Sequence, residues 1–231
     1  MNKAILSEQY PQFAEKLRDL GYQTIPTERV SCFLPFEQDH ADMQCLILDD
    51  TAFLLSSCLQ LANTLSKYYH VVLCETPLGG QYPGNVKLNA LQLGRRLISR
   101  VSSLDDAVKK YCLENDFKLI QVNQGYAKCS CAIVSDNAVI TSDNGVYNSL
   151  NATNVDVLQI KQGRVRLKGV DYGFIGGASG YDKQTKTIYF CGDITKHPDH
   201  DRVKEFCERY HTRVVSLSED ELTDIGGILF C

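Results

Sequence analysis

The chain has 231 residues, of which 44% are hydrophobic and 23% are charged. So many apolar residues are enough for a buried core and exclude a disordered chain. The formal net charge of −4 gives no general attraction to phosphate backbones, so we expect no nucleic-acid partner.

Five segments along the chain have the apolar spacing of an amphipathic helix, and a short β-rich segment follows each of them. The first helix is predicted over residues 8–20, with Gly21 ending it and a strand at 22–26. Residues 103–106 resemble a capping box that opens the third helix. The other helices are expected near 57–67, from 103, over 143–150 and from about 198, and their strands at 71–73, 118–120, 155–158 and 214–217.

Four of these helices are also preceded by β-rich segments, at 45–56, 86–100, 131–141 and 187–191. Asp136-Asn137 predicts a tight turn that folds one such segment into a hairpin. No strand is expected before the first helix. Residues 227–231 instead form an unpaired strand, which would close five units into a ring by joining the first. The competing fold is a doubly wound open sheet, but no glycine-rich nucleotide fingerprint opens a helix.

No apolar run reaches the length of a membrane span, and the apolar stretch near the N-terminus is too short for a signal peptide. We therefore predict a cytoplasmic protein with no membrane partner. Its ten cysteines are then expected as thiols rather than disulfides. Five of them lie in apolar segments and are interpreted as small buried hydrophobic residues: Cys45, Cys74, Cys112, Cys191 and Cys207.

Five β-rich units with one helix each, whose first unit is shared by both ends of the chain, resemble the pentein fold. That fold includes arginine deiminases, agmatine deiminases, dimethylargininases and amidinotransferases, together called guanidino-modifying enzymes, and a ribosome anti-association factor without catalytic role. The resemblance implies a single α/β domain over residues 1–231, a five-unit propeller with its helices outside and its C-terminal strand closing the first unit. Four segments also resemble a bacterial family of unknown function assigned to this fold: 124–130, 171–180, 197–199 and 222–229.

Guanidino-modifying enzymes use a cysteine nucleophile, a histidine that moves protons, and carboxylates that hold the cation. The resemblance places the cysteine near the C-terminus after a glycine-containing turn. Gly226-Gly227 before Cys231 match that pattern, so Cys231 is a candidate nucleophile. The neighbouring α-carboxylate would raise the pKa of its thiol, and the alternative is an edge-strand residue.

His197-Pro198-Asp199 matches the family's His-x-Asp motif and makes His197 the candidate acid/base. The motif lies nearer to Cys231 than it does in the family. The segment 142–144, where the family's histidine is expected, contains none. The alternative interpretation is a helix start, in which Pro198 fixes the backbone and Asp199 favours the helix N-terminus.

Cys129 and Cys131 alternate on a predicted strand, so both thiols are expected on one face. Cys129 is the second candidate nucleophile. The pair could also hold a soft metal, but the spacing of a structural zinc site is missing, and we predict no metal. Packed core thiols are the simplest alternative.

Asp143 and Asp193 each end the second strand of a unit, and in a closed ring equivalent strand ends are expected to face one axial cavity. We therefore expect at least two of Asp143, Asp193 and His197 to border that cavity. Helix capping is the alternative for Asp143.

The segments that carry the resemblance contribute the remaining candidates for substrate binding. They are the carboxylates Asp199 and Asp224, and Gly176 and Gly177 of the glycine-rich segment 173–180. Four glycines in eight residues predict either backbone amides lining a pocket or a sharp strand bend.

Together these residues predict a cysteine-dependent hydrolase or transferase that acts, without a cofactor, on the guanidine or amidine group of an arginine-like molecule. One alternative is a non-catalytic pentein scaffold that binds a small cationic ligand, such as a guanidine or amine, or a protein. Another is a metal site built from Cys129, Cys131 and histidines. The sequence names neither the substrate nor the oligomeric state.

Overall fold

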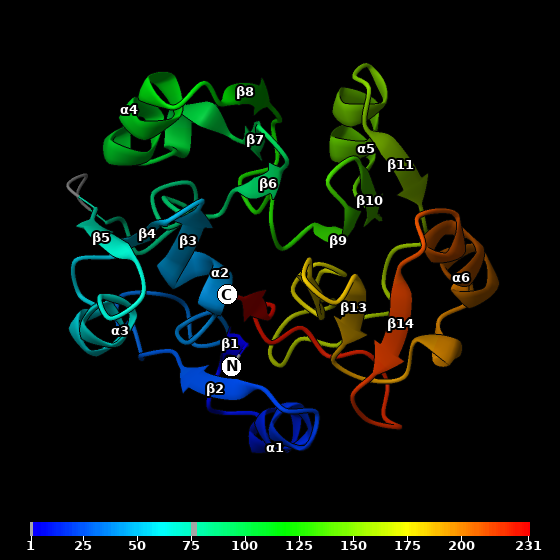
Figure 1. Cartoon of the computed structure of the whole chain (residues 1–231). Coiled ribbons are helices and arrows are strands. Elements are labelled where there is room, and N and C mark those ends of the chain that lie inside the picture. Colours follow the sequence, from blue (N-terminus) through cyan, green and yellow to red (C-terminus); the bar gives the residue numbers. More distant parts are fainter. Residues whose placement is uncertain (1, 75–77) are drawn as a thin grey trace.

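The computed structural model describes residues 2–74 and 78–231, and in it five three-stranded sheets surround a central axis (Figure 1). Each sheet has an antiparallel pair, and its third strand runs parallel to the second after a helical crossover. Unit one contains β15 (Leu229–Phe230), β1 (Lys3–Leu6) and β2 (Gln23–Pro26), and unit two contains β3 (Cys45–Leu48), β4 (Thr51–Leu54) and β5 (His70–Leu73). Unit three contains β6 (Leu91–Leu93), β7 (Arg96–Ser99) and β8 (Lys118–Gln121), and unit four contains β9 (Cys131–Ser135), β10 (Ala138–Thr141) and β11 (Asp156–Gln159). Unit five contains β12 (Ser179–Asp182), β13 (Thr187–Phe190) and β14 (Arg213–Ser216).

One long helix per unit lies on the outside of the ring, as predicted (Figure 1). The outer helices are amphipathic; α1, for example, buries Phe13 and Leu17. The helices are α1 (Pro11–Asp19), α2 (Ala41–Gln44), α3 (Leu59–Leu65), α4 (Asp106–Glu114), α5 (Asn144–Asn151) and α6 (His200–Arg209), with 3-10 turns η1 (Val101–Ser103) and η2 (Ile194–Lys196).

The ends of the chain meet in the first unit, which confirms the predicted closure of the ring. Strand β15 pairs antiparallel with β1, and the amides of Lys3 and Cys231 each donate to the other's carbonyl oxygen, at 2.8 and 3.0 Å. The expectation that no strand precedes the first helix is wrong, because β1 lies in the middle of this sheet. With only four residues, most of them buried, this strand is too short to show an alternating pattern in the sequence.

Two local predictions also need correction. The cap of α4 is Asp105, whose Oδ1 accepts from the Ala107 amide at 2.9 Å, whereas Ser103 belongs to the preceding 3-10 turn. The glycine-rich segment ends in an unpredicted strand, β12, paired antiparallel with β13. A Cβ on Gly180 would lie 2.5 Å from the Ile228 carbonyl oxygen, so only glycine lets this strand approach the C-terminal segment.

Aromatic packing and a buried hydrogen bond join the first and fifth units. The Tyr22 ring packs edge-on against Tyr189 and Phe230, with centroids 5.7 and 5.0 Å apart. The Tyr22 hydroxyl donates to Asp182 Oδ2 at 2.5 Å and also lies 3.0 Å from the Tyr189 hydroxyl. Aromatic pairs of this kind contribute beyond their buried area, so this contact stabilises the closed ring.

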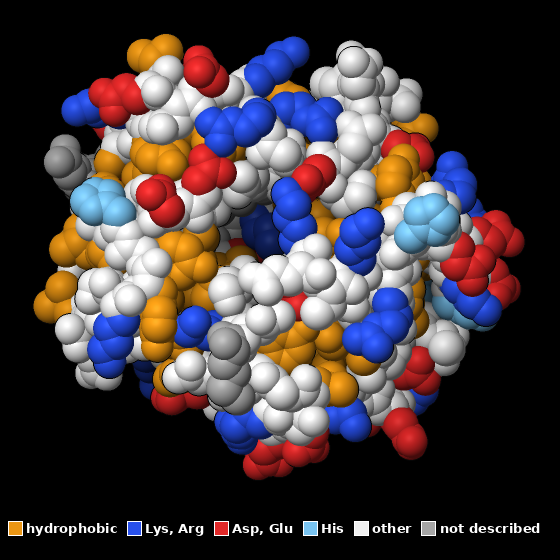
Figure 2. All heavy atoms as spheres, in the orientation of Figure 1, with side chains coloured by type: hydrophobic (Ala, Val, Ile, Leu, Met, Phe, Trp, Pro, Cys, Tyr) orange, Lys and Arg blue, Asp and Glu red, His pale blue; other side chains and the backbone are white. Residues whose placement is uncertain are grey.

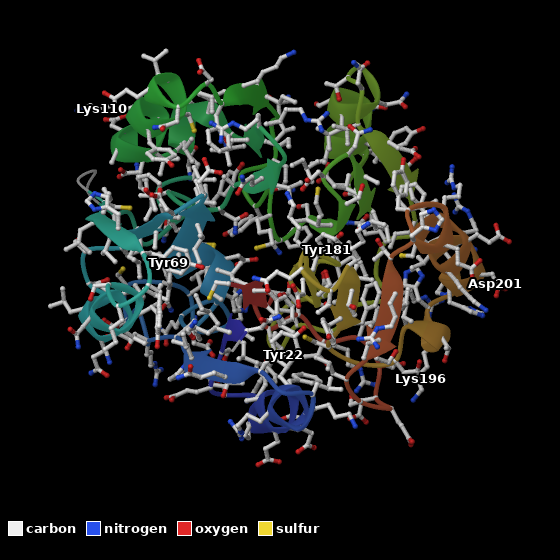
Figure 3. All side chains as sticks on the ribbon, in the orientation of Figure 1. Tyr22, Tyr69, Lys110, Tyr181, Lys196 and Asp201 are labelled. Carbon is white, nitrogen blue, oxygen red and sulfur yellow. The ribbon has the colours of Figure 1, made fainter. Side chains whose placement is uncertain are left out.

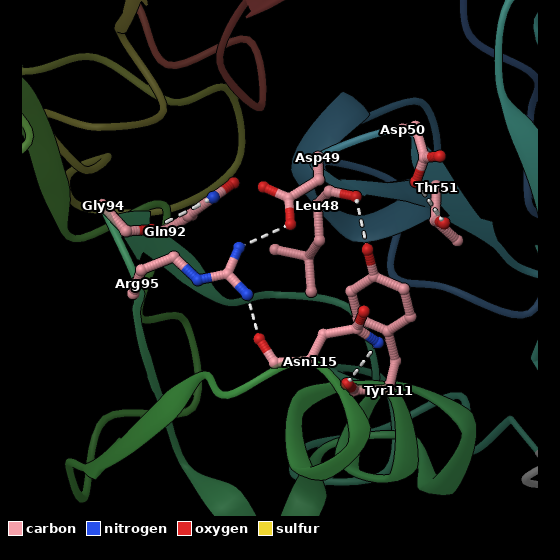
Figure 4. A network of polar contacts seen from close by, with 9 residues as sticks. All are labelled: Leu48, Asp49, Asp50, Thr51, Gln92, Gly94, Arg95, Tyr111 and Asn115. Carbon is pink, nitrogen blue, oxygen red and sulfur yellow. Dashed lines mark hydrogen bonds and ion pairs between the residues drawn. The ribbon is translucent and has the colours of Figure 1, made fainter.

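Polar side chains connect the second and third units where their hairpins turn (Figure 4). Arg95 Nη1 lies 2.6 Å from Asp49 Oδ2, and its Nη2 donates to the Asn115 carbonyl oxygen. The Tyr111 hydroxyl donates to the Leu48 carbonyl at 3.4 Å. Because the ion pair is exposed it contributes below about 1 kcal/mol, and the apolar cores carry the stability.

No helix in the described part of the chain is both long enough and apolar enough to cross a membrane.

Candidate functional site

One residue from each unit meets its neighbours at the axis of the ring. Each of the five stands two positions before the first strand of its unit: Met43, Asn89, Cys129, Gly177 and Gly227. We call these five residues the axial ring.

Hydrogen bonds link the members of the axial ring in order. Asn89 Nδ2 lies 3.4 Å from Met43 Sδ and 3.0 Å from Cys129 Sγ. The Gly177 amide donates to the Cys129 carbonyl at 3.0 Å, and the Gly227 amide donates to the Gly177 carbonyl at 2.7 Å. The packing of five equivalent segments, each just before the first strand of its unit, therefore positions the side chains on either side of the ring.

Asp42 immediately precedes Met43 of the axial ring and contacts another of its members, Cys129. Cys129 Sγ donates to Asp42 Oδ2 at 3.0 Å. Asp42 is only 1% exposed, and its Oδ1 has no hydrogen-bond partner among the described residues. Burial raises the pKa of Asp42 to about 6, although the charges of Lys128 and His40 oppose the rise. The site thus holds a carboxyl group whose protonation changes just below neutral pH.

The Cys129 thiol is protonated in this environment. Burial raises its pKa well above the ordinary value, and the negative charges of Asp42 and Asp224 raise it further. The hydrogen bond from Asn89 only partly offsets these effects. Cys129 is therefore a thiol that donates to Asp42 and not a preformed thiolate.

A cavity of about 380 Å³ leads to this group of residues. Asp42 and Lys128 line it together with apolar side chains such as Ile47 and Ile133. Figure 2 shows a hollow at the centre of this face with a basic side chain inside it. Two further lining residues, Tyr69 and Tyr181, come from opposite sides of the axis (Figure 3). We call this space the axial cavity.

Of the predicted residues, Gly177 belongs to the axial ring, and Gly176 and Asp224 lie beside it. Asp224 Oδ2 accepts from the Phe174 amide at 2.8 Å and its Oδ1 from the Gly226 amide at 2.9 Å, so backbone donors already engage both oxygens. A Cβ on Gly177 would overlap the Asp224 carboxylate, and one on Gly176 would overlap backbone carbonyl oxygens. The glycines here allow close packing of loops around the axis.

Cys231 lies beside the wall of the axial cavity. Its thiol lies beside the side chain of Tyr69, which lines that cavity, and burial raises the pKa of the Cys231 thiol. Tyr69 and the Lys3 charge oppose this rise. No hydrogen bond between described side chains joins Cys231 to a histidine.

His197 ends the 3-10 turn η2 and Asp199 is the N-cap of α6, and neither belongs to the axial ring. His197 is 2% exposed, and its Nδ1 accepts from the Asp199 amide at 3.1 Å. Asp199 accepts from the Lys161 amide and from Arg202, at 2.8 and 2.9 Å. Burial lowers the pKa of His197, which lines a separate cavity of about 620 Å³.

Asp143 and Asp193 cap helical turns and lie apart from the described lining of the axial cavity, as does His197. Asp143 Oδ1 accepts from the Val146 amide at 2.8 Å, and Asp193 Oδ1 from the Thr195 amide at 2.9 Å. Both follow second strands, whereas residues of first strands line the cavity. A neighbouring strand lies about 4.8 Å farther out, so equivalent ends of second strands do not converge on the axis.

Sequence reasoning missed Asp42, Asn89 and Lys128. The sequence pattern is clearest in the third strands, which lie outermost, whereas the innermost strand of unit five, β12, is not predicted from it. The available signal is positional: in each unit the informative residues stand two or three positions before the first strand. The same positional signal separates Cys129 from Cys131. Cys129 stands two positions before β9 and belongs to the axial ring, whereas Cys131 is the first residue of β9 and packs in the core.

In the described part of the chain, no three His, Cys, Asp or Glu side chains are grouped closely enough to hold a metal ion.

Comparisons with known proteins support the fold. A family model described as a family of unknown function, DUF6873, matches residues 5–229. No curated protein sequence matches significantly.

Three solved structures illustrate the likeness. Dimethylarginine dimethylaminohydrolase from Pseudomonas aeruginosa, complexed with citrulline, has a TM-score of 0.60 at 11% identity, over 94% of this chain and 91% of the enzyme. C. jejuni agmatine deiminase gives 0.55 at 9% identity, over 94% and 86%. An amidinotransferase of saxitoxin biosynthesis from Microseira wollei gives 0.53 at 9% identity, over 96% and 93%. All three are penteins, which confirms the predicted fold.

Proposed function

Because this chain belongs to the DUF6873 family of unknown function and has the fold of guanidino-modifying enzymes, we propose that its axial cavity binds a small molecule with a guanidine or amidine group. Asp42 is the residue that accepts this group.

The observation that carries the proposal is the unpartnered, buried Oδ1 of Asp42, a residue that lines the cavity. A buried carboxylate oxygen without a donor is costly, and a planar guanidinium or amidinium ion supplies N–H donors matched to a carboxylate. The cavity volume of about 380 Å³ suits a small ligand. A bound cation would also favour the ionised form of Asp42, and therefore lower its pKa.

Calorimetric titration with guanidine, amidine and primary-amine compounds tests this proposal. Binding needs ionised Asp42, and with its pKa at about 6 we expect affinity to be about tenfold weaker at pH 5 than at pH 7.5. Asp42→Asn should weaken binding by about 100-fold, whereas Asp19→Asn, at an exposed position of α1, should not change it. If no compound of the three classes binds, the proposal fails.

A second candidate function, chemical modification of the bound group, is favoured by the 3.0 Å contact between Cys129 Sγ and Asp42 Oδ2. A guanidinium ion beside the thiol would lower its pKa and let the proton pass to Asp42. The thiolate would then form a C–S bond to the guanidinium carbon. An amine would leave with the proton returned by Asp42, and water or an acceptor amine would release the remaining group from sulfur.

Turnover assays on serine variants separate modification from binding alone. Cys129→Ser should lower kcat by at least about 1,000-fold, with ligand affinity within about threefold of the unsubstituted protein. Cys231→Ser and His197→Asn test the other residues predicted for catalysis. Loss of turnover in Cys231→Ser with full turnover in Cys129→Ser would assign the nucleophile to Cys231. Binding without any turnover would identify a non-catalytic scaffold, for which the raised pKa of Cys129 is the supporting observation.

A further inference from the structure

Two buried side chains of opposite charge line the deep part of the axial cavity. They are Asp42, 1% exposed, and Lys128, 8% exposed. Lys128 stands three positions before β9, next to Cys129 of the axial ring. A cavity built only for a cation would not be expected to contain a buried ammonium group.

The Lys128 ammonium has unused hydrogen-bonding capacity. It carries three N–H donors, and its hydrogen bond within the described chain is to the Gly176 carbonyl oxygen, at 3.2 Å. No carboxylate oxygen of a described residue lies within ion-pair distance of Nζ. A Cβ on Gly227 would lie 3.2 Å from Nζ, so the glycine lets the backbone approach the ammonium closely. Asp42 is close enough to feel the Lys128 charge but makes no direct ion pair with it, so the buried ammonium has donors left for an anionic ligand group.

The charges at the outer end of the cavity are already paired. Lys183 Nζ lies 2.6 Å from Asp136 Oδ2, and Asp49 Oδ2 lies 2.6 Å from Arg95 Nη1. A charged ligand group would have to break these pairs to bind there. The unsatisfied acceptor, on Asp42, and the unsatisfied donors, on Lys128, are both in the deep part.

We propose that Lys128 binds a carboxylate of the ligand, and that the ligand is a short guanidino or amidino acid instead of a plain cation. Its carboxylate contacts Lys128 and its cationic group contacts Asp42. The cationic half of this inference rests on the proposed function, whereas the carboxylate half rests on Lys128 alone.

The test compares three compounds by calorimetry at pH 7.5: 3-guanidinopropionate, propylguanidine and propionate. The unsubstituted protein should bind 3-guanidinopropionate at least tenfold more tightly than propylguanidine. Lys128→Met, which keeps the length of the side chain and removes its charge, should lose that preference. Lys183→Met, at the outer end of the cavity, should keep it.

The outcomes separate the two proposals. The role of Lys128 is overturned if the unsubstituted protein binds the two guanidines equally well. It is also overturned if Lys183→Met, and not Lys128→Met, loses the preference. Either result leaves the proposed function standing. Propionate binding that Lys128→Met abolishes, without binding of either guanidine, supports the carboxylate site and refutes the proposed function. No binding of any compound overturns both. If Lys128→Met does not fold, the preference of the unsubstituted protein decides.

Discussion

Replacing Asp42 by asparagine is expected to stabilise the folded protein at neutral pH, although the same change removes the proposed ligand contact. Asparagine has nearly the same shape, and its oxygen can still accept from Cys129 Sγ, so the change mainly removes a charge. A residue whose charge is retained at a cost in stability is typical of a functional site.

The sign follows from the pKa of Asp42, which burial raises from an ordinary 3.8 to about 6. Between these values the folded chain keeps a proton that the unfolded chain has lost. The contribution of Asp42 to the free energy of unfolding therefore falls as pH rises from about 4 to 6 and is constant above that range. The difference of about two pKa units corresponds to about 3 kcal/mol.

Urea unfolding measured between pH 4 and pH 7.5 tests this expectation. The free energy of unfolding of Asp42→Asn minus that of the unsubstituted protein should be about 3 kcal/mol larger at pH 7.5 than at pH 4. Asp19→Asn is the matched control, because it removes an exposed carboxylate from α1. An Asp42→Asn curve parallel to that of the unsubstituted protein would show that burial does not perturb this carboxyl.

Replacing Asn89 by alanine is expected to cost about 3–5 kcal/mol of stability. The Asn89 side-chain oxygen accepts from the amides of Lys128 and Cys129, at 2.8 and 3.3 Å. Its Nδ2 donates to the Asp42 carbonyl at 3.2 Å and contacts two sulfur atoms. Alanine leaves the two amides and the carbonyl buried without these partners and opens a small cavity at the axis.

Equilibrium unfolding in urea measures this loss. Asn63→Ala, on an exposed position of α3, should change the free energy of unfolding by no more than about 0.5 kcal/mol. A cost below about 1 kcal/mol for Asn89→Ala would mean that water replaces the amide and that the axial ring does not depend on this side chain.

The fold could largely be predicted because its signals are local and repeated. Amphipathic spacing located the five outer helices, and the turn at Asp136-Asn137 lies between β9 and β10 as expected. Strands β1 and β12 were missed for physical reasons. Buried residues at three of the four positions of β1 mask alternation, and glycine in β12 normally argues against a strand.

The candidate site was harder to predict because its residues come together only through the packing of separate units. Asp42 lies in a four-residue helix, and Asn89 and Lys128 lie in loops without a recognisable motif. Motif reasoning favoured His197 and Cys231, whose chemistry is familiar. The structure places His197 between η2 and α6, and Cys231 beside Tyr69. Only the assays on their variants test the roles predicted for them.

The pairing of β1 with β15 has a kinetic consequence. It joins segments near opposite ends of the chain, at Ala4 and Phe230, so it has one of the largest loop-closure costs in the molecule. Contacts of such long range form late and slowly compared with the hairpins inside each unit. Gly227, which completes the axial ring, immediately precedes this last strand. We therefore expect the axial cavity to take shape only when folding is complete, so that partly folded chains do not present it.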